Sequence, residues 1–128
     1  MKQKHRVLVV DDERLVLGAM QRILRRYEVT ACESLAEARC ALEAGSFDAV
    51  VSDVELRDGT GIELFEEVHA RHPEQAERFV FVSGAADDPT VRALLERTGR
   101  PFLRKPFEVS RLLEFVASTI EGRRSDKL

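Results

Sequence analysis

Short apolar runs alternate with longer amphipathic segments along the chain. The runs are rich in β-branched and aromatic residues, which favours buried strands over helical segments of the same length. They are RVLVV (6–10), VTAC (29–32), AVV (49–51), FVFV (79–82) and a weaker PFL (101–103). A segment with helical spacing follows each run. The pattern therefore predicts five strand–helix units with no element left over.

The helical segments carry start and stop signals. Ser34 and Glu37 have the spacing of a capping box at the start of the second helix, and Gly45 is expected to end it. The third helix is expected to end before Pro73. The fourth begins at the acid–proline pair 88–89, where the acid caps the helix and proline takes its first position.

Apolar positions in the helices recur at intervals of three and four residues, as on one face of an α-helix. The stripes of the first, third and fifth helices are Leu15, Val16, Ala19, Met20, Ile23 and Leu24; Ile62, Phe65 and Val68; and Val109, Leu112, Leu113, Val116, Ala117 and Ile120. Each stripe predicts the face that packs on the sheet.

Strands that alternate with helices predict an α/β fold, in which a parallel sheet is covered by helices on both faces. Right-handed crossovers leave few layouts for five strands. The order 2-1-3-4-5 is a common one, although periodicity alone does not choose it. Pro101 suits an edge position for the fifth strand, because its missing N–H then leaves no ladder bond unmade.

Length and composition indicate one soluble domain. The chain has 128 residues, of which 44% are hydrophobic and 34% charged. A chain of this length can bury enough apolar surface to form a core without disulfides or metals. We assign residues 5–121 to the domain and residues 1–4 and 122–128 to solvated tails. No apolar run approaches the roughly 20 residues that span a bilayer, and MKQKHR lacks a signal-type apolar region, so we expect a cytoplasmic protein without membrane contact. The net charge of −3 gives no electrostatic argument for nucleic acid as a direct partner.

The two cysteines, Cys32 and Cys40, show neither a CxxC motif nor a histidine pattern typical of a metal site. Free cysteine behaves as a small apolar residue in a reducing compartment. We therefore expect two buried thiols.

Polar residues stand at the carboxyl ends of four predicted strands. Asp11 and Asp12 follow the first, Asp53 the third, Ser83 the fourth and Lys105 the fifth. Open parallel sheets bind ligands at these ends. If the first and third strands are neighbours, three carboxylates converge, and their repulsion requires positive charge nearby. Lys105 supplies one charge, and Mg²⁺, which binds a few carboxylates and retains several waters, fits best as the other.

Each of these residues also has an ordinary structural explanation. Two acids before a helix commonly cap its N-terminus and complement its dipole. A single Asp, Ser or Lys after a strand is most often a loop residue. All of them together, at the strand ends of one five-strand pattern, are far more specific and favour a functional site.

Four motifs occur in order: VLVVDDE, AVVSDVELRDGTG, FVFVSGAAD and PFLRKPF. They resemble the successive motifs of the receiver domain of two-component response regulators, in the CheY-like superfamily, and the resemblance covers residues 5–121. It implies a flavodoxin-like (βα)5 fold, a doubly wound parallel sheet with strand order 2-1-3-4-5. It also implies a bacterial signal-transduction phosphoprotein. Its donor would be a phosphohistidine on a sensor histidine kinase or a histidine phosphotransfer protein of a phosphorelay.

The resemblance implies roles for the acids. Asp53 would be the phosphoacceptor. Asp12 would bind Mg²⁺ directly, and Asp11 mainly through water. Asp53 and the backbone carbonyl of Glu55 would complete the protein's metal ligands.

The resemblance also implies roles for residues on the last two strands. Ser83 would hydrogen-bond the incoming phosphoryl group, and Lys105 would pair with its oxygens. The Lys105–Pro106 peptide bond is expected to be cis. Ser83 and Phe102, which occupies the aromatic switch position, would change conformation on phosphorylation.

The sequence departs from the commonest receiver pattern in that Arg57 replaces a frequent proline, Glu55 places an acid beside the metal site, Ala85 is small and Phe102 replaces a frequent tyrosine. None of these changes removes an essential group. Because phenylalanine has no hydroxyl to leave in water, we expect its ring to lie inward even without phosphate. The loop after the fourth strand would then carry most of the switch.

Two rival functions fit part of the pattern. A haloacid-dehalogenase-type phosphatase also uses a strand-end Asp and Mg²⁺, but its signature needs a second Asp where this chain has Glu55. A phosphorylation-independent interaction module on the same fold is the other alternative, and the intact set of strand-end residues argues against it. We expect a phosphoacceptor that assists its own phosphorylation and dephosphorylation rather than a turnover enzyme.

Only EGRRSDKL follows the last predicted helix. We therefore expect output by contact with a downstream protein, through the face formed by the fourth helix, the fifth strand and the fifth helix. A free-standing regulator, a phosphorelay shuttle and the receiver of a larger hybrid kinase all fit the sequence.

Overall fold

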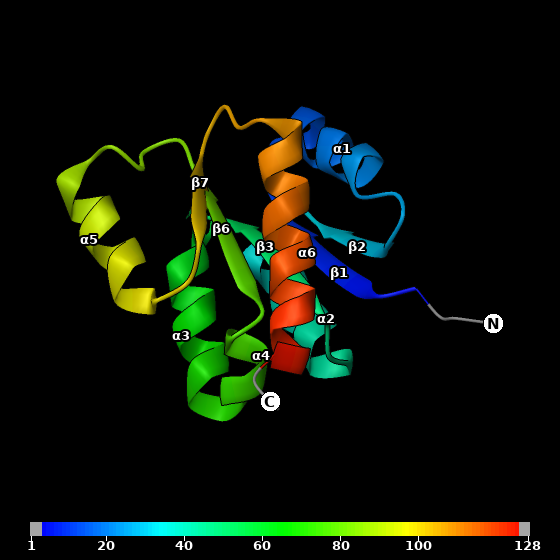
Figure 1. Ribbon diagram of the computed structural model, residues 1–128. Coiled ribbons are helices and arrows are strands. Elements are labelled where there is room, and N and C mark those ends of the chain that lie inside the picture. The colour runs from blue at the N-terminus through cyan, green and yellow to red at the C-terminus, as the bar shows by residue number, and fades with distance from the viewer. Residues whose placement is uncertain (1–3, 126–128) are drawn as a thin grey trace.

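A five-stranded parallel sheet forms the centre of the structure, a computed structural model that describes residues 4–125 (Figure 1). Its strands are β1 (Arg6–Val10), β2 (Glu28–Cys32), β3 (Ala49–Asp53), β6 (Phe79–Ser83) and β7 (Phe102–Arg104). They lie in the order β2-β1-β3-β6-β7. This is the 2-1-3-4-5 order of the predicted strands, so the flavodoxin-like fold prediction is confirmed. Pro101 precedes β7, which is an edge strand as expected.

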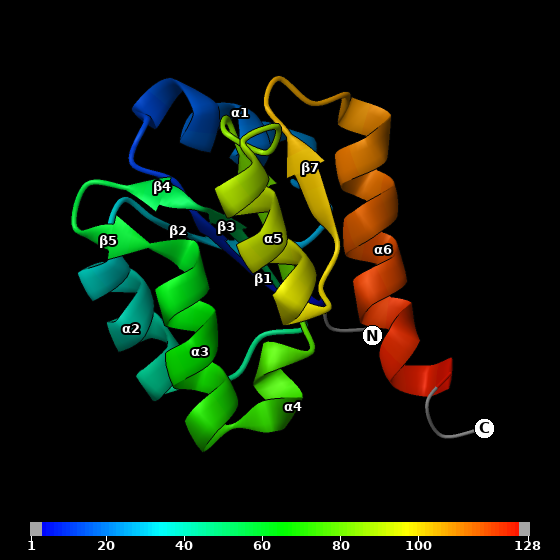
Figure 2. The same ribbon diagram turned by 90° about the vertical axis from the view of Figure 1, so that its left-hand side faces the viewer.

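Helices cover both faces of the sheet (Figures 1 and 2). They are α1 (Arg14–Ile23), α2 (Leu35–Ala44), α3 (Gly61–Arg71), α4 (Pro73–Ala76), α5 (Pro89–Thr98) and α6 (Val109–Ser125). Two features were not predicted. One is the single turn α4, which starts at Pro73 directly after α3. The other is a hairpin of two-residue strands, β4 (Glu55–Leu56) and β5 (Gly59–Thr60), in the loop that follows β3.

The core is divided by the sheet into two layers. Alternate residues of each strand point to opposite faces, so β1 contributes Leu8 and Val10 to one layer and Val7 and Val9 to the other. The first layer packs against α2, α3, α4 and α5, and the second against α1 and α6. Because both faces are covered, β3 and β6 are buried along their whole length. The sheet is therefore a rigid base for the residues at its carboxyl edge.

The apolar stripe of α1 was predicted in part incorrectly. Leu15 is 90% exposed, and the helix instead buries Leu17 and Met20, followed by Leu24 just after its end. Leu15 lies about 160° around the helix axis from this seam at 100° per residue, so it faces solvent. Val109, the first residue of the apolar stripe predicted for the last helix, is 51% exposed because it is the first residue of α6.

The predicted capping box at the start of α2 was also corrected. Ser34 Oγ accepts the Glu37 N–H at 3.1 Å, but the Glu37 carboxylate accepts the N–H of Glu33 rather than that of Ser34. A reciprocal capping box is present instead at Thr60 and Glu63, at the start of α3.

One cysteine and the end of the last helix also differ from expectation. Cys32 is a buried free thiol, as predicted, whereas Cys40 is free but exposed. Helix α6 continues to Ser125, whereas EGRRSDKL (121–128) was expected to follow the last helix. Gly122 alone does not stop it, because glycine costs a helix interior only about 1 kcal/mol relative to alanine. Residues 1–3 and 126–128 of the predicted tails lie outside the described residues. Within the described part of the chain, the helices are too short or too polar to cross a membrane.

Candidate functional site

Asp53 is the last residue of β3 and is only 2% exposed. Its backbone is fixed on both sides. The neighbouring Val54 N–H donates to the Val82 carbonyl of β6 at 2.9 Å, and Ser52 Oγ donates to the Asp53 carbonyl at 3.0 Å. Gly61 at the start of α3 lies so close that a Cβ there would collide with the Asp53 carbonyl oxygen. The carboxylate is therefore held at the carboxyl edge of the sheet by a rigid backbone.

Lys105 joins acids from two other segments of the chain. Its Nζ donates to Asp11 Oδ2 at 2.9 Å, to Asp53 Oδ2 at 3.1 Å and to Glu13 Oε1 at 3.2 Å. The Lys105 N–H also donates to the Ser83 carbonyl at 2.8 Å, which ties the segment after β7 to the end of β6. The Lys105–Pro106 peptide bond is cis, as the resemblance implied.

The charges of the cluster are strongly coupled. Burial raises the pKa of Asp53 to about 6, helped by the Asp11 carboxylate and opposed by Lys105. Burial disfavours the Lys105 ammonium, but the hydrogen bonds and charges of Asp11 and Asp53 outweigh this and raise its pKa. Lys105 is therefore a permanent cation, whereas Asp53 carries a carboxylate that is unusually costly to keep ionised.

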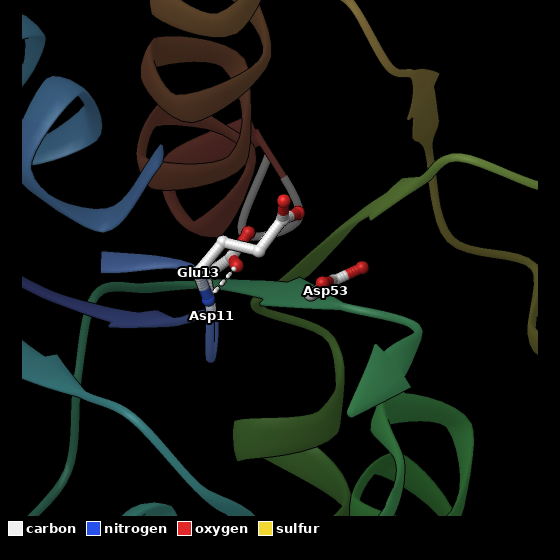
Figure 3. A group of neighbouring side chains, drawn as sticks. All are labelled: Asp11, Glu13 and Asp53. Atoms are coloured by element: carbon white, nitrogen blue, oxygen red, sulfur yellow. Dashed lines mark hydrogen bonds between the residues drawn. The ribbon is translucent and has the colours of Figure 1, made fainter. Parts of the chain in front are cut away.

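Asp11, Glu13 and Asp53 form a group that could hold a metal ion. One carboxylate oxygen from each lies within 4.8 Å of the others. Figure 3 shows Asp11 and Glu13 just past the end of β1, facing Asp53 at the end of β3. The Glu13 N–H donates to Asp11 Oδ1 at 2.8 Å, which fixes the turn between them. Clustered carboxylate oxygens are the donor type that Mg²⁺ takes, so these residues fit the predicted ion.

Sequence reasoning missed Glu13. The signal was present as the third consecutive acid of VLVVDDE, a motif in which only Asp11 and Asp12 were singled out. Its backbone is the N-cap of α1, and its side chain makes no cap bond. The carboxylate is consequently available to the cluster.

Asp12 lies apart from this group. Its Oδ2 accepts the Arg57 N–H at 2.8 Å and stands 3.9 Å from the Arg57 guanidinium. This contact links the segment after β1 to the β4–β5 hairpin. Arg57, singled out as a departure from the commonest pattern, is therefore the partner of a predicted metal ligand.

Ser83, the last residue of β6, is fully buried and faces the hairpin. Its Oγ accepts the Ala85 N–H at 3.0 Å and donates to Glu55 Oε2 at 2.7 Å. The other oxygen of Glu55 accepts the Gly84 N–H at 3.1 Å. Glu55 was expected to offer its backbone carbonyl to the metal and to place an acid beside that site. In the structure its carboxylate engages Ser83.

Phe102, the first residue of β7, is half-buried and packs against the layer of the core that contains Ala86. The Arg92 guanidinium lies 5.8 Å from its ring centroid and donates from Nε to the Ala86 carbonyl at 3.2 Å. The ring is neither free in solvent nor fully enclosed, so the expected inward position is only partly reached.

Comparison with known proteins places the chain in a family. The response regulator receiver domain family matches residues 7–117. The response regulator protein PilR of Pseudomonas aeruginosa is 30% identical over 122 residues, covering 94% of this chain and 27% of PilR. The sensor kinase CckA of Brucella abortus is 36% identical over 119 residues, covering 90% of this chain and 12% of CckA. The chain thus spans about a quarter or less of these relatives.

The solved structures agree. A CheY-like response regulator receiver domain protein from Methanospirillum hungatei superimposes with a TM-score of 0.87 at 26% identity, covering 98% of this chain and 99% of that one. The family match, the shared fold and the acids joined by Lys105 at the carboxyl edge of the sheet lead to one conclusion: the chain belongs to the receiver domain family of two-component response regulators.

Proposed function

We propose that this receiver accepts a phosphoryl group on Asp53, as part of a two-component or phosphorelay system. The observation that carries the proposal is the arrangement around one buried carboxylate. Asp53 Oδ2 receives the Lys105 ammonium, Oδ1 receives the Glu55 N–H at 3.3 Å, and two further acids lie beside it. Such a carboxylate is rigid, in contact with a fixed cation, and close to a group suited to Mg²⁺.

The proposed donor is a phosphohistidine on a sensor histidine kinase or a histidine phosphotransfer protein. An Asp53 oxygen attacks the phosphorus atom, the new P–O bond forms, and the P–N bond breaks. The electron pair stays on the imidazole nitrogen, which is left as a neutral ring once proton balance with solvent is restored. The product is an acyl phosphate, whose added charge and acceptor oxygens act as the signal.

Phosphoryl transfer needs mainly alignment and neutralisation of charge on the transferred group. We expect Lys105 to pair with the phosphoryl oxygens, because its Nζ contacts Asp53 Oδ2. The Ser83 hydroxyl and the neighbouring Gly84 N–H are donors on the same edge of the sheet. These are the groups that we propose to hold the phosphoryl group once it is on Asp53.

Mg²⁺ would be held by Asp11, Glu13 and Asp53, with Asp12 and the Glu55 carbonyl as the further ligands that the family resemblance implies. When bound, the ion supplies additional positive charge for the phosphoryl oxygens. For Asp12 to take part directly, its carboxylate would have to leave the Arg57 N–H.

The protein is proposed to assist its own phosphorylation and dephosphorylation without turning over a separate substrate. Receivers are signalling domains of response regulators.

The output is proposed to pass to a downstream protein across the α5–β7–α6 face. A hollow of about 400 Å³ on that face is lined partly by Arg92, Arg104, Arg111, Phe102 and Phe107. Three arginines beside two aromatic rings suit an acidic segment of a partner.

The exposed free thiol of Cys40 suits the reducing cytoplasm, the location that we propose.

The test is phosphorylation by a small-molecule donor, acetyl phosphate, with Mg²⁺. Intact mass should increase by one phosphoryl group in the wild type and not in Asp53→Asn. Asp88→Asn is the matched control, since Asp88 is exposed and its side chain makes no cap bond to α5. Equal labelling of Asp53→Asn and the wild type would refute the assignment. No labelling of any form, and no binding of beryllofluoride, would favour a phosphorylation-independent module.

A further inference from the structure

The Glu55 side chain occupies the two hydrogen-bond donors at the end of β6. Its carboxylate spans them, with Oε2 receiving the Ser83 hydroxyl at 2.7 Å and Oε1 receiving the Gly84 N–H at 3.1 Å. The contact is long-range in sequence, since 28 and 29 residues separate the partners. A hydroxyl and an adjacent backbone N–H that both point at one carboxylate constitute a small anion-binding site.

The orientation of the Ser83 hydroxyl follows from its contacts. Its oxygen accepts the Ala85 N–H at 3.0 Å, so its single proton is directed to Glu55. A serine hydroxyl has one proton to donate. Ser83 therefore cannot donate to Glu55 and to a phosphoryl oxygen at the same time.

Repulsion between negative charges also prevents Glu55 and a phosphoryl group from sharing these donors. Glu55 is one of the acids that raise the pKa of Asp53, after burial and the Asp11 carboxylate. A phosphoryl group on Asp53 would bring up to two negative charges toward the donors that Glu55 holds. Like charges at this range repel, and the buried setting of Ser83 and Asp53 weakens solvent screening.

The hairpin leaves Glu55 free to move while the backbone stays in place. Glu55 is exposed, although the serine that it contacts is fully buried. The turn of the hairpin is tied to the start of α2, where Asp58 accepts the N–H groups of Leu35 and Ala36 at 3.1 and 3.2 Å. Rotation of the Glu55 side chain into solvent therefore needs no change in the hairpin.

We infer that the Glu55 carboxylate is an internal competitor of the phosphoryl group for the Ser83 hydroxyl and the Gly84 N–H. The inference rests on the proposed phosphorylation of Asp53. Before phosphorylation, Glu55 holds both donors in the arrangement of a bound anion. Phosphorylation then exchanges one anion for another, and Glu55 is released to solvent on the hairpin. The competitor lowers the affinity of the site for a phosphoryl group and limits how far the Ser83–Gly84 segment moves.

The test is a titration with beryllofluoride, a phosphoryl mimic, in the presence of Mg²⁺. Amide resonances of the ¹⁵N-labelled full chain report both affinity and loop movement. Glu55→Ala should bind beryllofluoride on the order of tenfold more tightly, the equivalent of about 1.4 kcal/mol. Without the mimic, this variant should shift the Gly84 and Ala85 amides, and binding should then shift them further than in the wild type.

Two further variants separate competition from a general loss of negative charge. Glu66→Gln removes one charge from an exposed position on α3 and should leave the affinity unchanged. In a Ser83→Ala background, Glu55→Ala should lose most of its effect, because the shared hydroxyl is gone.

The outcomes are distinct. Tighter binding by Glu55→Ala, with Glu66→Gln unchanged, supports the inference, and this holds even if the wild type binds too weakly to measure. Wild-type binding with equal or weaker binding by Glu55→Ala overturns the inference and leaves phosphorylation of Asp53 intact. Failure of both forms to bind overturns the proposed function and the inference with it.

Discussion

Asp11 and Lys105 are 94 residues apart in the sequence, yet the Lys105 Nζ donates to Asp11 Oδ2 at 2.9 Å. The strands that precede them, β1 and β7, are separated in the sheet by β3 and β6. The Lys105 side chain reaches back along the carboxyl edge of the sheet and also donates to Asp53, at the end of β3. Asp11 is fully buried, so its charge requires this partner. Lys105 is therefore both a structural counter-ion and the cation of the proposed phosphoryl site.

Asp53→Asn should stabilise the metal-free protein at neutral pH. Burial raises the folded-state pKa of Asp53 from 3.8 to about 6, so the folded protein holds this proton more tightly than the unfolded chain. Ionising Asp53 therefore destabilises the folded state. This destabilisation is absent below pH about 4, grows as the pH rises to about 6, and is complete above that pH. Removing it should raise the free energy of unfolding by on the order of 2–3 kcal/mol at pH 7.5.

Urea unfolding with chelator at pH 4 and pH 7.5 measures this effect. The gain should be present at pH 7.5 and nearly absent at pH 4. A gain of equal size at both pH values would mean that the Asp53 charge is not its source. Lys105→Met is the opposing variant, because it leaves buried acids unpaired and should cost about 3–5 kcal/mol.

Mg²⁺ should stabilise the folded chain, and Glu13 should contribute to this effect. An ion that binds only the native state adds about 1.4 kcal/mol at ten times its Kd. Glu13→Gln removes one of the three clustered carboxylates and should weaken Mg²⁺ binding severalfold. Melting temperature against Mg²⁺ concentration gives the Kd, with Glu66→Gln as the control for loss of one exposed charge. Identical Mg²⁺ curves for Glu13→Gln and the wild type would remove Glu13 from the site.

Gly61→Ala should disturb Asp53 through its backbone. A Cβ at position 61 would collide with the Asp53 carbonyl oxygen and lie 2.6 Å from Ser52 Oγ. Both belong to a buried strand that cannot retreat, so the cost should be about 1–3 kcal/mol. Gly18→Ala within α1 is the matched control, because its Cβ would meet only Arg22 Nη1, at 3.7 Å. That change should be neutral or stabilise by up to about 1 kcal/mol.

Chemical denaturation of both glycine variants tests this contrast. Acetyl phosphate labelling should also slow in Gly61→Ala, because the acceptor is displaced, and remain normal in Gly18→Ala. Equal stabilities of the two variants would show that the start of α3 can move away from β3.

The sequence was sufficient to predict the helices and strands whose signals are local and strong. The apolar runs predicted β1, β2, β3, β6 and β7 to within two residues at each end. The strand order came from the family resemblance, because periodicity says which residues are apolar and not which strands are neighbours. The β4–β5 hairpin has two residues in each strand, too few for any pattern to register.

The site was predictable where residue type and strand position coincide. Asp11, Asp53 and Lys105 each follow or end a strand, and the sheet brings them together. Glu55 was expected to place its carbonyl and an acid at the metal site. The contact of its carboxylate with Ser83 depends on the end of β6, which no local pattern contains. The prediction that Leu15 is buried was wrong for a geometric reason. The predicted stripe of six residues is wider than the narrow face that α1 buries.

Leu15 should contribute to recognition of the proposed phosphohistidine donor rather than to folding. Its side chain is 90% exposed in the first turn of α1, two residues after Glu13, whose carboxylate contacts Lys105. A protein that delivers a phosphoryl group to Asp53 has to cover this rim of the sheet. Burying an apolar side chain of this size contributes about 1.5–3 kcal/mol. Leu15→Asn should therefore slow transfer from the cognate kinase, identified by phosphotransfer profiling, by tenfold or more.

The contrast between donors separates docking from chemistry. Acetyl phosphate needs no protein contact, so Leu15→Asn should accept its phosphoryl group at the wild-type rate, with stability within about 0.5 kcal/mol. Leu94→Asn is the matched control, because Leu94 is 38% exposed on α5, on the opposite side of the sheet from α1. It should transfer normally from the kinase. Equal slowing with both donors would place Leu15 in the structure of the site, and unaltered kinase transfer would place the docking contact elsewhere on the rim.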